Sequence, residues 1–197
     1  MSMEKADRKI QIEPVSAENV QDFLDFFDGL GFEDHPDWKI CYCYSFHFTG
    51  TGEEWNIPGR NRECARDYII NCKMRGYLAY HDGKPVGWCN ANDKNNYERF
   101  SILPEIPESP DKKVCSVVCF VISPEFRGRG IASGLLSRIC EDYKKKGYDY
   151  VEAYPSNDNR KQSDHWQGPP AMYKKRGFVK VSEHKDFILM HKYLKRD

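Results

Sequence analysis

An apolar run at 114–122, VCSVVCFVI, leads directly into a glycine-rich loop and then into an amphipathic segment. The run is typical of a buried strand. Residues 131–146 then carry apolar side chains at helical spacing: Ala132, Leu135, Leu136, Ile139, Cys140 and Tyr143. Lysines at 144–146 favour the C-terminal end of a helix dipole, and Gly147 ends the helix. Strand, loop and helix therefore form the centre of the predicted fold.

The loop between this strand and helix contains Gly128 and Gly130, with Gly134 following in the helix. Backbone N–H groups converge at such a helix N-terminus and bind phosphate, and glycines let the backbone approach closely. No Gly-Lys-Ser/Thr follows, so this is not a Walker loop, and the spacing differs from the dinucleotide fingerprint. A tight turn that merely needs glycine has the same appearance. The loop alone leaves both interpretations open.

The first part of the chain predicts a strand at 9–13 and a helix capped by Ser16. Four apolar residues form the helix stripe: Val20, Phe23, Leu24 and Phe27. Glycines at 29 and 31 end this helix. The next segments are predicted as follows: irregular chain at 35–59, a helix at 61–75 ending at Gly76, a hairpin turning at Asp82-Gly83, and a loop at 97–113.

Beyond the central helix, YDYVEAY at 148–154 predicts another strand. A short helix around 169–176 and strands near 178–183 and 186–194 complete the pattern. We find no internal repeat and no low-complexity segment. The order of elements predicts an α/β or α+β domain built on one mixed sheet.

Composition limits the classes of protein to which the chain can belong. Its 197 residues suit one domain, so we expect 1–197 to form a single unit with 1–8 as a flexible tail. Thirty basic residues balance thirty acidic ones, which argues against a non-specific nucleic-acid binder. No apolar run approaches the roughly 18 residues of a membrane span, and the N-terminus lacks a signal core. We therefore expect a cytoplasmic protein whose eight cysteines are free thiols.

The string Arg127-Gly128-Arg129-Gly130-Ile131-Ala132 matches Q/R-x-x-G-x-G/A, the acetyl-CoA signature of the GNAT N-acetyltransferases. FVISPEFRGRGIASGLL, PPAMYKKRGFVKV and the hairpin YLAYHDGKPVGWC also resemble that family. The resemblance covers roughly residues 76–194. Residues 35–60 and 97–113 match no general family pattern, and such regions usually decide the substrate. The resemblance implies a GNAT fold, with a single mixed, mostly antiparallel sheet flanked by helices.

The resemblance also implies acetyl-CoA as co-substrate, with no metal. The pyrophosphate would lie on the N–H groups of residues 128–134, and the pantetheine arm would pair with the strand before the loop. The cofactor-binding residues implied are Phe120, Val121, Ile122, Arg127, Gly128, Arg129, Gly130, Ile131, Ala132, Ser133 and Gly134.

Acyl transfer from a thioester to an amine needs a neutral amine, donors for the oxyanion and a proton for the thiolate. Tyr173 stands where the family keeps its general acid, and a tyrosine of pKa near ~10 is still protonated at neutral pH. The alternative is a ring that simply packs under the helix.

The general base is less well defined by the sequence. Glu152 shares a strand face with Tyr150 and Tyr154 and can take a proton directly or through water. The alternative is an ordinary polar strand position or a structural hydrogen-bonding partner. His47, His165 and Asp93 are further candidates, and a chain of water molecules can also serve.

Cys41-Tyr42-Cys43 lies in the segment that the family does not explain. In a strand the two thiols would point the same way, about 7 Å apart. A zinc site needs four ligands and a longer knuckle than C-x-C. The nearby aromatic residues suit two interpretations, a substrate pocket and plain packing in the core. We predict a substrate pocket that is lined by Cys41, Cys43 and Tyr44.

The predicted function is acetyl transfer from acetyl-CoA to a primary amine of a small molecule or peptide, directly within a ternary complex. The partners expected are these two substrates, with no nucleic acid and no membrane, in a monomer or homodimer. Two alternatives stay open: a non-catalytic acyl-CoA-binding or sensing module of the same fold, and a zinc-binding interaction protein. The sequence does not name the amine.

Overall fold

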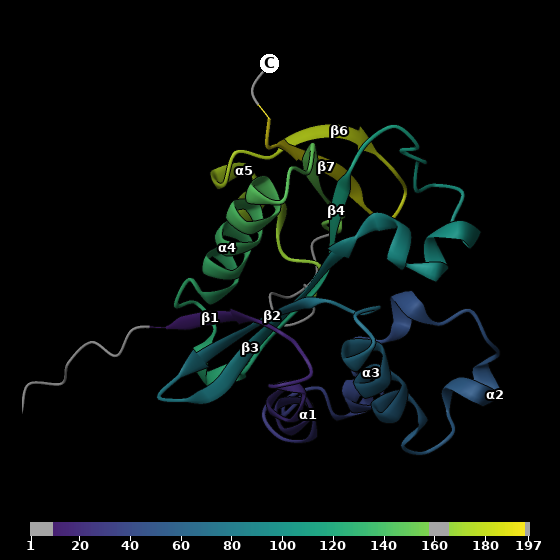
Figure 1. Ribbon diagram of the computed structural model, residues 1–197, viewed down its shortest axis with the longest axis vertical. Coiled ribbons are helices and arrows are strands. Elements are labelled where there is room, and N and C mark those ends of the chain that lie inside the picture. The colour runs from purple at the N-terminus through teal and green to yellow at the C-terminus, as the bar shows by residue number, and fades with distance from the viewer. Residues whose placement is uncertain (1–9, 158–165, 196–197) are drawn as a thin grey trace, which may run out of the picture.

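The computed structural model describes residues 10–157 and 166–195. Within them seven strands form one sheet in the order β1-β2-β3-β4-β5-β7-β6 (Figure 1). The strand bounds are β1 Gln11–Pro14, β2 Gly76–His81, β3 Lys84–Asp93, β4 Val114–Ile122, β5 Tyr150–Ala153, β6 Val179–Glu183 and β7 Ile188–Tyr193. Only the β4–β5 pair is parallel. The prediction of one mixed, mostly antiparallel sheet is confirmed.

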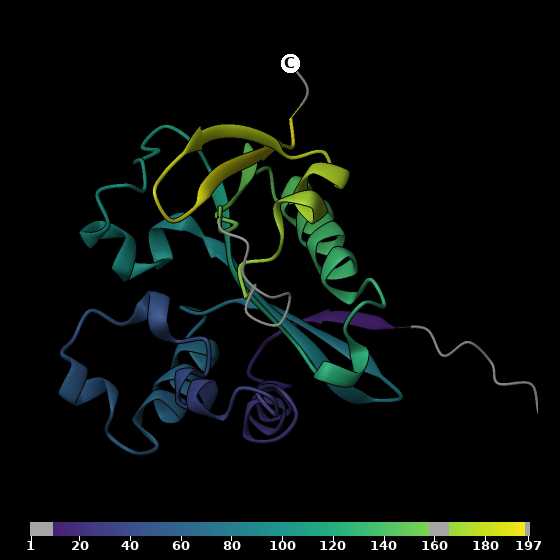
Figure 2. The ribbon, with the colours of Figure 1, turned by 180° about the vertical axis from the view of Figure 1, so that it is seen from behind.

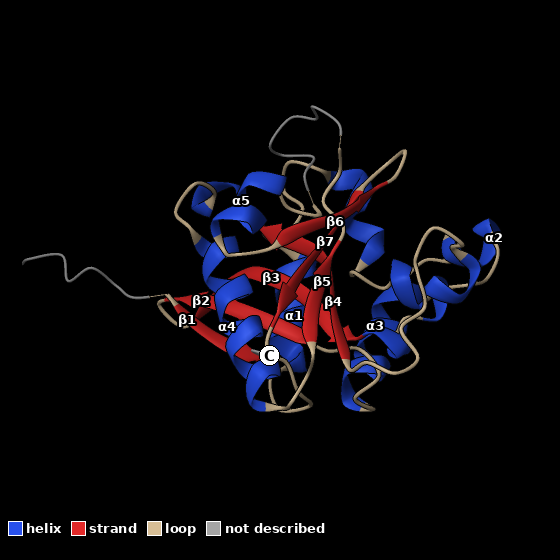
Figure 3. Cartoon of the chain, turned by 90° about the horizontal axis from the view of Figure 1, so that it is seen from above, coloured by secondary structure: helices blue, strands red, loops and turns tan. Residues whose placement is uncertain are grey.

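Helices cover both faces of this sheet. Their bounds are α1 Val20–Asp28, α2 Gly52–Trp55, α3 Arg60–Ile70, α4 Ile131–Lys145 and α5 Pro170–Lys175. Figure 3 shows α4 and α1 on opposite sides of the strands. In β4 Val118 packs in the aromatic cluster of α1 and α3, whereas Val117 packs with α4. Burial on both faces explains why β4 is apolar throughout.

The strand, loop and helix at the centre of the fold lie where the sequence predicts them. Short turns of 3₁₀ helix lie in the regions predicted to be irregular or a loop, at Pro36–Cys41, Ser45–His47 and Glu98–Ile102, and two more lie outside those regions, at Lys94–Asn96 and Pro124–Phe126. The hairpin turn is confirmed, because Asp82 and Gly83 both have positive φ, 54° and 73°. No helix in the described ranges is long and apolar enough to cross a membrane.

Two of the predicted helix boundaries are wrong. Asn19, not Ser16, is the N-cap residue of α1, and its side chain accepts a hydrogen bond from the Ser16 N–H at 2.7 Å. Helix α3 ends at Ile70 rather than at Gly76, because Cys72 adopts a left-handed φ of 58°. Gly76 instead begins β2, where any Cβ would lie 2.2 Å from the Trp88 ring.

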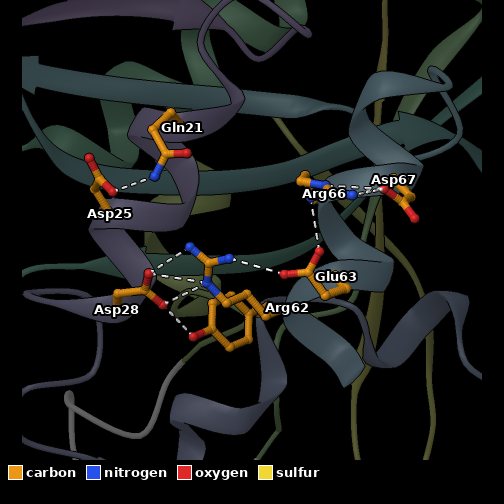
Figure 4. Close-up of polar contacts among 8 residues, drawn as sticks. Gln21, Asp25, Asp28, Arg62, Glu63, Arg66 and Asp67 are labelled. Atoms are coloured by element: carbon orange, nitrogen blue, oxygen red, sulfur yellow. Dashed lines mark hydrogen bonds and ion pairs between the residues drawn. The ribbon is translucent and has the colours of Figure 1, made fainter. Parts of the chain in front are cut away.

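Helices α1 and α3 are joined by an ion pair at the C-terminal end of α1 (Figure 4). Arg62 of α3 holds Asp28 with Nη2–Oδ2 at 3.0 Å, and the Tyr42 hydroxyl donates to the same carboxylate. Burial alone would raise the pKa of Asp28, but the hydrogen bonds from Arg62 and Tyr42 outweigh it and lower the pKa. These contacts anchor the segment that follows α1.

Asp28→Asn should lower the free energy of unfolding by no more than about 1 kcal/mol at pH 7, because this ion pair is partly exposed. The folded pKa lies below the unfolded value of about 3.9. The stabilisation is therefore present above pH ~4 and disappears as pH falls through the folded pKa. Denaturant titrations at pH 7 and pH 3 check this. Asp25→Asn, which affects only a hydrogen bond to Gln21, is the control; an Asp28→Asn effect independent of pH contradicts the assignment.

Candidate active site

The sheet opens between its two parallel strands. β4 and β5 pair only over Val114–Val117 and Tyr150–Ala153, although β4 continues to Ile122. Beyond the pairing, the Phe120 N–H donates to the Trp166 carbonyl at 2.5 Å. Figure 2 shows this region from behind, with α5 lying beside α4. The second half of β4 therefore has one edge available to something other than a neighbouring strand.

A cavity of about 450 Å³ lies at this opening. Nine of the residues predicted to bind the cofactor line it: Phe120, Val121, Ile122, Arg127, Gly128, Gly130, Ile131, Ala132 and Ser133. The structure thus brings together the strand end, the glycine loop and the first turn of α4 around one space. Arg129 and Gly134 are not among its lining residues.

The glycine loop has the backbone geometry of an anion site. Gly128 and Gly130 have φ of 75° and 79°, which side chains rarely adopt, and no atom lies within 4 Å of a Cβ built at either position. Gly130 is the N-cap of α4, so the N–H groups of the next turn lack partners within the helix. Their free N–H groups and the helix dipole favour a phosphate there.

The other predicted loop residues have contacts within the protein. The Arg127 guanidinium binds both oxygens of Asp34 and donates through Nε to the Ile122 carbonyl at 3.0 Å. Arg129 lies over the Phe126 ring at 5.0 Å. A Cβ on Gly134 would lie 3.2 Å from the Ile12 side chain, so this glycine allows α4 to approach β1.

Tyr173 of α5 is fully buried beside the cavity. Its hydroxyl donates to the Gln167 carbonyl at 2.7 Å, and a Cβ on Gly168, which lines the cavity, would lie 3.4 Å from that hydroxyl. Burial raises the pKa of Tyr173 well above its ordinary value. The hydroxyl is therefore protonated at neutral pH and one residue away from the cavity wall.

Glu152 is buried in an ion-pair network on β5 rather than in the cavity wall. Its carboxylate meets Lys94 Nζ at 2.8 Å and His191 Nε2 at 2.9 Å, and it accepts a hydrogen bond from Tyr154. Burial would raise the pKa of Glu152, but His191 and Lys94 outweigh it and hold the pKa below its ordinary value. A carboxylate held in this way is a weak base, so the geometry favours the alternative of a structural partner.

The remaining base candidates also lie apart from the cavity. His47 Nδ1 is 3.0 Å from the Asn96 carbonyl, and burial lowers the pKa of this imidazole. Asp93 accepts a hydrogen bond from Tyr148 at 2.9 Å. Neither residue lines either cavity at the site. His165 lies outside the described residues.

A second cavity, of about 240 Å³, adjoins the first. Phe32, Trp38 and Trp166 line both spaces. The other lining residues of the second cavity are Asp37, Ile40, Cys41, Ser45, Phe46, Trp55 and Cys119. It is therefore built mainly from the segment 32–55, which the sequence analysis left without a family pattern.

Cys41 lines this second cavity, but Cys43 and Tyr44 do not. These two cysteines do not lie in a strand, because a 3₁₀ turn over Pro36–Cys41 leads into left-handed residues at Tyr42 and Cys43. Cys43 and Tyr44 are buried in the aromatic core. Within residues 10–157 and 166–195, no three His, Cys, Asp or Glu side chains are grouped to hold a metal ion.

Eleven of the residues that line the first cavity were not predicted from the sequence as site residues, among them His35, Trp38, Trp166 and Lys175. Lys175 lies two residues after Tyr173 in the same short helix, so its proximity to a predicted site residue could have indicated that it lies near the site. Nothing local marks Trp38 or Trp166, which come together only through the fold.

A model of the acetyltransferase (GNAT) family matches residues 38–178 of this chain, more than half of its length. The chain belongs to the GNAT family. An uncharacterized N-acetyltransferase of Methanocaldococcus jannaschii is 29% identical over 113 residues, which are 56% of this chain and 42% of that relative. This chain thus matches less than half the length of that GNAT relative.

Solved structures share the GNAT fold. The PaiA N-acetyltransferase of Thermoplasma acidophilum, in complex with coenzyme A, has a TM-score of 0.55 at 16% identity, covering 94% of this chain and 99% of that one. YncA of Salmonella typhimurium, a putative acetyltransferase with its cofactor acetyl-CoA, has a TM-score of 0.53 at 11% identity, with 95% of both chains covered. The predicted family and fold are confirmed.

Proposed function

We propose that this protein transfers an acetyl group from acetyl-CoA to a primary amine by direct attack in a ternary complex. The observation that carries the proposal is the pair of adjoining cavities. The first cavity begins at the glycine loop, whose N–H groups suit an anion. The second cavity is a separate, largely apolar space, and three residues line both cavities. One space suits a phosphate-bearing donor, and the other suits an acceptor.

The donor would lie with its pyrophosphate on the N–H groups of the loop and of the first turn of α4. Lys175 adds a cation to the same cavity. The pantetheine arm would extend along β4 at Phe120, Val121 and Ile122, which line the cavity. A carbonyl oxygen of this arm would take the place of the Trp166 carbonyl as the acceptor of the Phe120 N–H.

In the transfer step, the lone pair of the neutral amine forms a C–N bond to the thioester carbonyl, and the C–S bond breaks. The attacking nitrogen loses one proton to solvent, and the thiolate takes one from the Tyr173 hydroxyl, which solvent then reprotonates. A proton donor must hold its proton until the thiolate forms, and the Tyr173 hydroxyl is protonated at neutral pH, although burial makes it a weaker acid than a free tyrosine. Rotation of the hydroxyl from the Gln167 carbonyl would aim it past Gly168 into the cavity.

Direct transfer is favoured over a covalent cysteine intermediate. Cys41 and Cys119 line the second cavity, in which we place the acceptor. Burial raises the pKa of Cys41 to about 11, and a hydrogen bond with Cys43 together with burial raises that of Cys119. The thiolate is the nucleophilic form, so both groups are poor nucleophiles at neutral pH.

Gly130→Asp should weaken coenzyme A binding about 100-fold. A side chain there would fill the open space beside the loop in which the phosphate would lie, and its carboxylate repels the phosphate by about 1–4 kcal/mol between bulk-water and near-surface dielectric. Calorimetric titration with coenzyme A measures the loss, and release of thiol from acetyl-CoA with an amine measures turnover.

Gly147→Asp is the matched control for this variant. Gly147 has a similar φ of 78° and open surroundings, but it lies at the other end of the same helix. Its substitution should leave coenzyme A affinity unchanged. Equal affinities of wild type and a folded Gly130→Asp variant would overturn the phosphate site. Coenzyme A binding without turnover of any amine would instead identify a sensing module.

A further inference from the structure

We call the second cavity the acceptor cavity. Half of its ten lining residues are aromatic. Five rings contribute: Phe32, Trp38, Phe46, Trp55 and Trp166. Neighbours hold several of them in place. Trp38 stacks on His35 with centroids 4.2 Å apart, and Phe46 lies 6.1 Å from Trp166. Such a chamber offers ring faces and edges to a flat apolar group.

Among the described residues, Asp37 is the one acidic side chain that lines the acceptor cavity. The two cysteines of the wall are neutral, since the pKa of Cys41 is raised to about 11 and that of Cys119 is raised as well. A single carboxylate among ring faces attracts a cation, by charge and through the rings. The cavity is therefore suited to one ammonium group on an apolar body.

The size of the cavity limits that body. A volume of about 240 Å³ equals the share of roughly eight water molecules in the liquid. One six-membered ring with a short alkyl arm fits this space. An amino sugar would bury several hydroxyls, and Ser45 is the one hydroxyl among the described residues that line this cavity; unpaired buried hydroxyls are costly. A polyamine carries further cations, and the described lining residues include no second carboxylate to pair with them.

We propose that the acceptor is an arylalkylamine, a primary amine on a short alkyl arm attached to one aromatic ring. The ring lies among the tryptophans, and the nitrogen lies toward Phe32, Trp38 and Trp166, where the two cavities meet. This inference rests on the proposed acetyl transfer. The ammonium releases one proton to water, and the neutral nitrogen then attacks the thioester as described above, yielding an amide and coenzyme A.

The first test compares acceptors by the rate of thiol release from acetyl-CoA. The panel is 2-phenylethylamine, ethylamine, spermidine, glucosamine and a short peptide with a free N-terminus. We expect kcat/KM for 2-phenylethylamine to exceed that for ethylamine roughly 10- to 100-fold, the value of burying one ring. We expect the other three acceptors to fall below 2-phenylethylamine.

The second test uses Asp37→Asn, which should raise the KM for 2-phenylethylamine roughly 10-fold through loss of a charged partner. The KM for acetyl-CoA should not change, because Asp37 lines the acceptor cavity and not the first cavity. The melting temperature should not change either, because Asp37 is exposed. Asp111→Asn, at an exposed aspartate in the loop before β4, is the matched control and should leave both KM values unchanged.

A third readout does not need turnover. Three of the four tryptophans of the chain line the acceptor cavity, and the fourth, Trp88, is fully buried elsewhere. Titration of 2-phenylethylamine in the presence of coenzyme A should change tryptophan emission, and Trp55→Phe should reduce that change.

The outcomes separate this inference from the proposed function. Preference for spermidine, glucosamine or the peptide would overturn the arylalkylamine while leaving acetyl transfer intact. Equal kcat/KM values for ethylamine and 2-phenylethylamine would do the same. Failure of every amine, with acetyl-CoA bound, would overturn the proposed function and this inference together.

Discussion

Tyr173→Phe should lower kcat by roughly 10²- to 10⁴-fold, the range of a lost general acid. The variant keeps the ring and its packing against Phe178, whose centroid is 5.2 Å away. The KM for acetyl-CoA should change little, because the hydroxyl lies behind Gly168 and not in the cavity wall. Pre-steady-state kinetics separate the chemical step from product release.

The variant also leaves the Gln167 carbonyl without its donor, which costs about 1–3 kcal/mol of stability. Tyr143→Phe controls for this loss, because the buried Tyr143 hydroxyl also donates to a backbone carbonyl, that of Ala91, at 3.1 Å. Both variants should melt at lower temperature, and only Tyr173→Phe should lose kcat. A Tyr173→Phe enzyme with the kcat of wild type, where chemistry limits the rate, would exclude the acid role.

Glu152→Gln should lower the free energy of unfolding by about 3–5 kcal/mol, because it leaves a buried ammonium without its counter-charge. Lys94 is only 7% exposed, and its charge is balanced by this carboxylate at 2.8 Å. Glu183→Gln is the matched control, since Glu183 also pairs with a lysine but lies exposed on β6. That control should leave the stability nearly unchanged.

The pH dependence gives a second measurement on the same pair. The folded pKa of Glu152 is lowered, so its contribution is fully present above the unfolded pKa of about 4.3 and is lost as pH falls through the folded pKa. The difference between wild type and Glu152→Gln should hold from pH 8 to pH 5 and shrink in more acidic solution. A stable variant with collapsed kcat would restore Glu152 as the general base.

The cofactor side of the site was predictable because its determinants are local. Left-handed turns require glycine at positions such as 128 and 130, and burial on both faces makes β4 apolar along its whole length. These constraints operate within a few residues and leave their marks in the sequence. Helix ends were less predictable, since a left-handed Cys72 ends α3 where propensity would continue it.

Local pattern could not decide the role of Glu152. The alternation of side chains along a strand predicts that Glu152 shares a face with Tyr154. It does not predict which residues pack against that face. Lys94 reaches the carboxylate from the turn after β3, and His191 reaches it from β7, both far away in sequence. Their approach converts a candidate base into a buried anion of lowered pKa.

By itself, then, the sequence determined the family, the sheet and the glycine loop, because backbone conformation and apolar spacing are local properties. Only the tertiary structure decided the second cavity, in which we place the acceptor. This cavity is lined by residues that are scattered over the chain: Trp38, Trp55, Cys119 and Trp166. They come together because β4 and β5 stop pairing after Val117 and because the segment that follows α1 packs beside β4. Shape and charge in such a chamber depend on distances between remote residues, and these exist only in the folded protein.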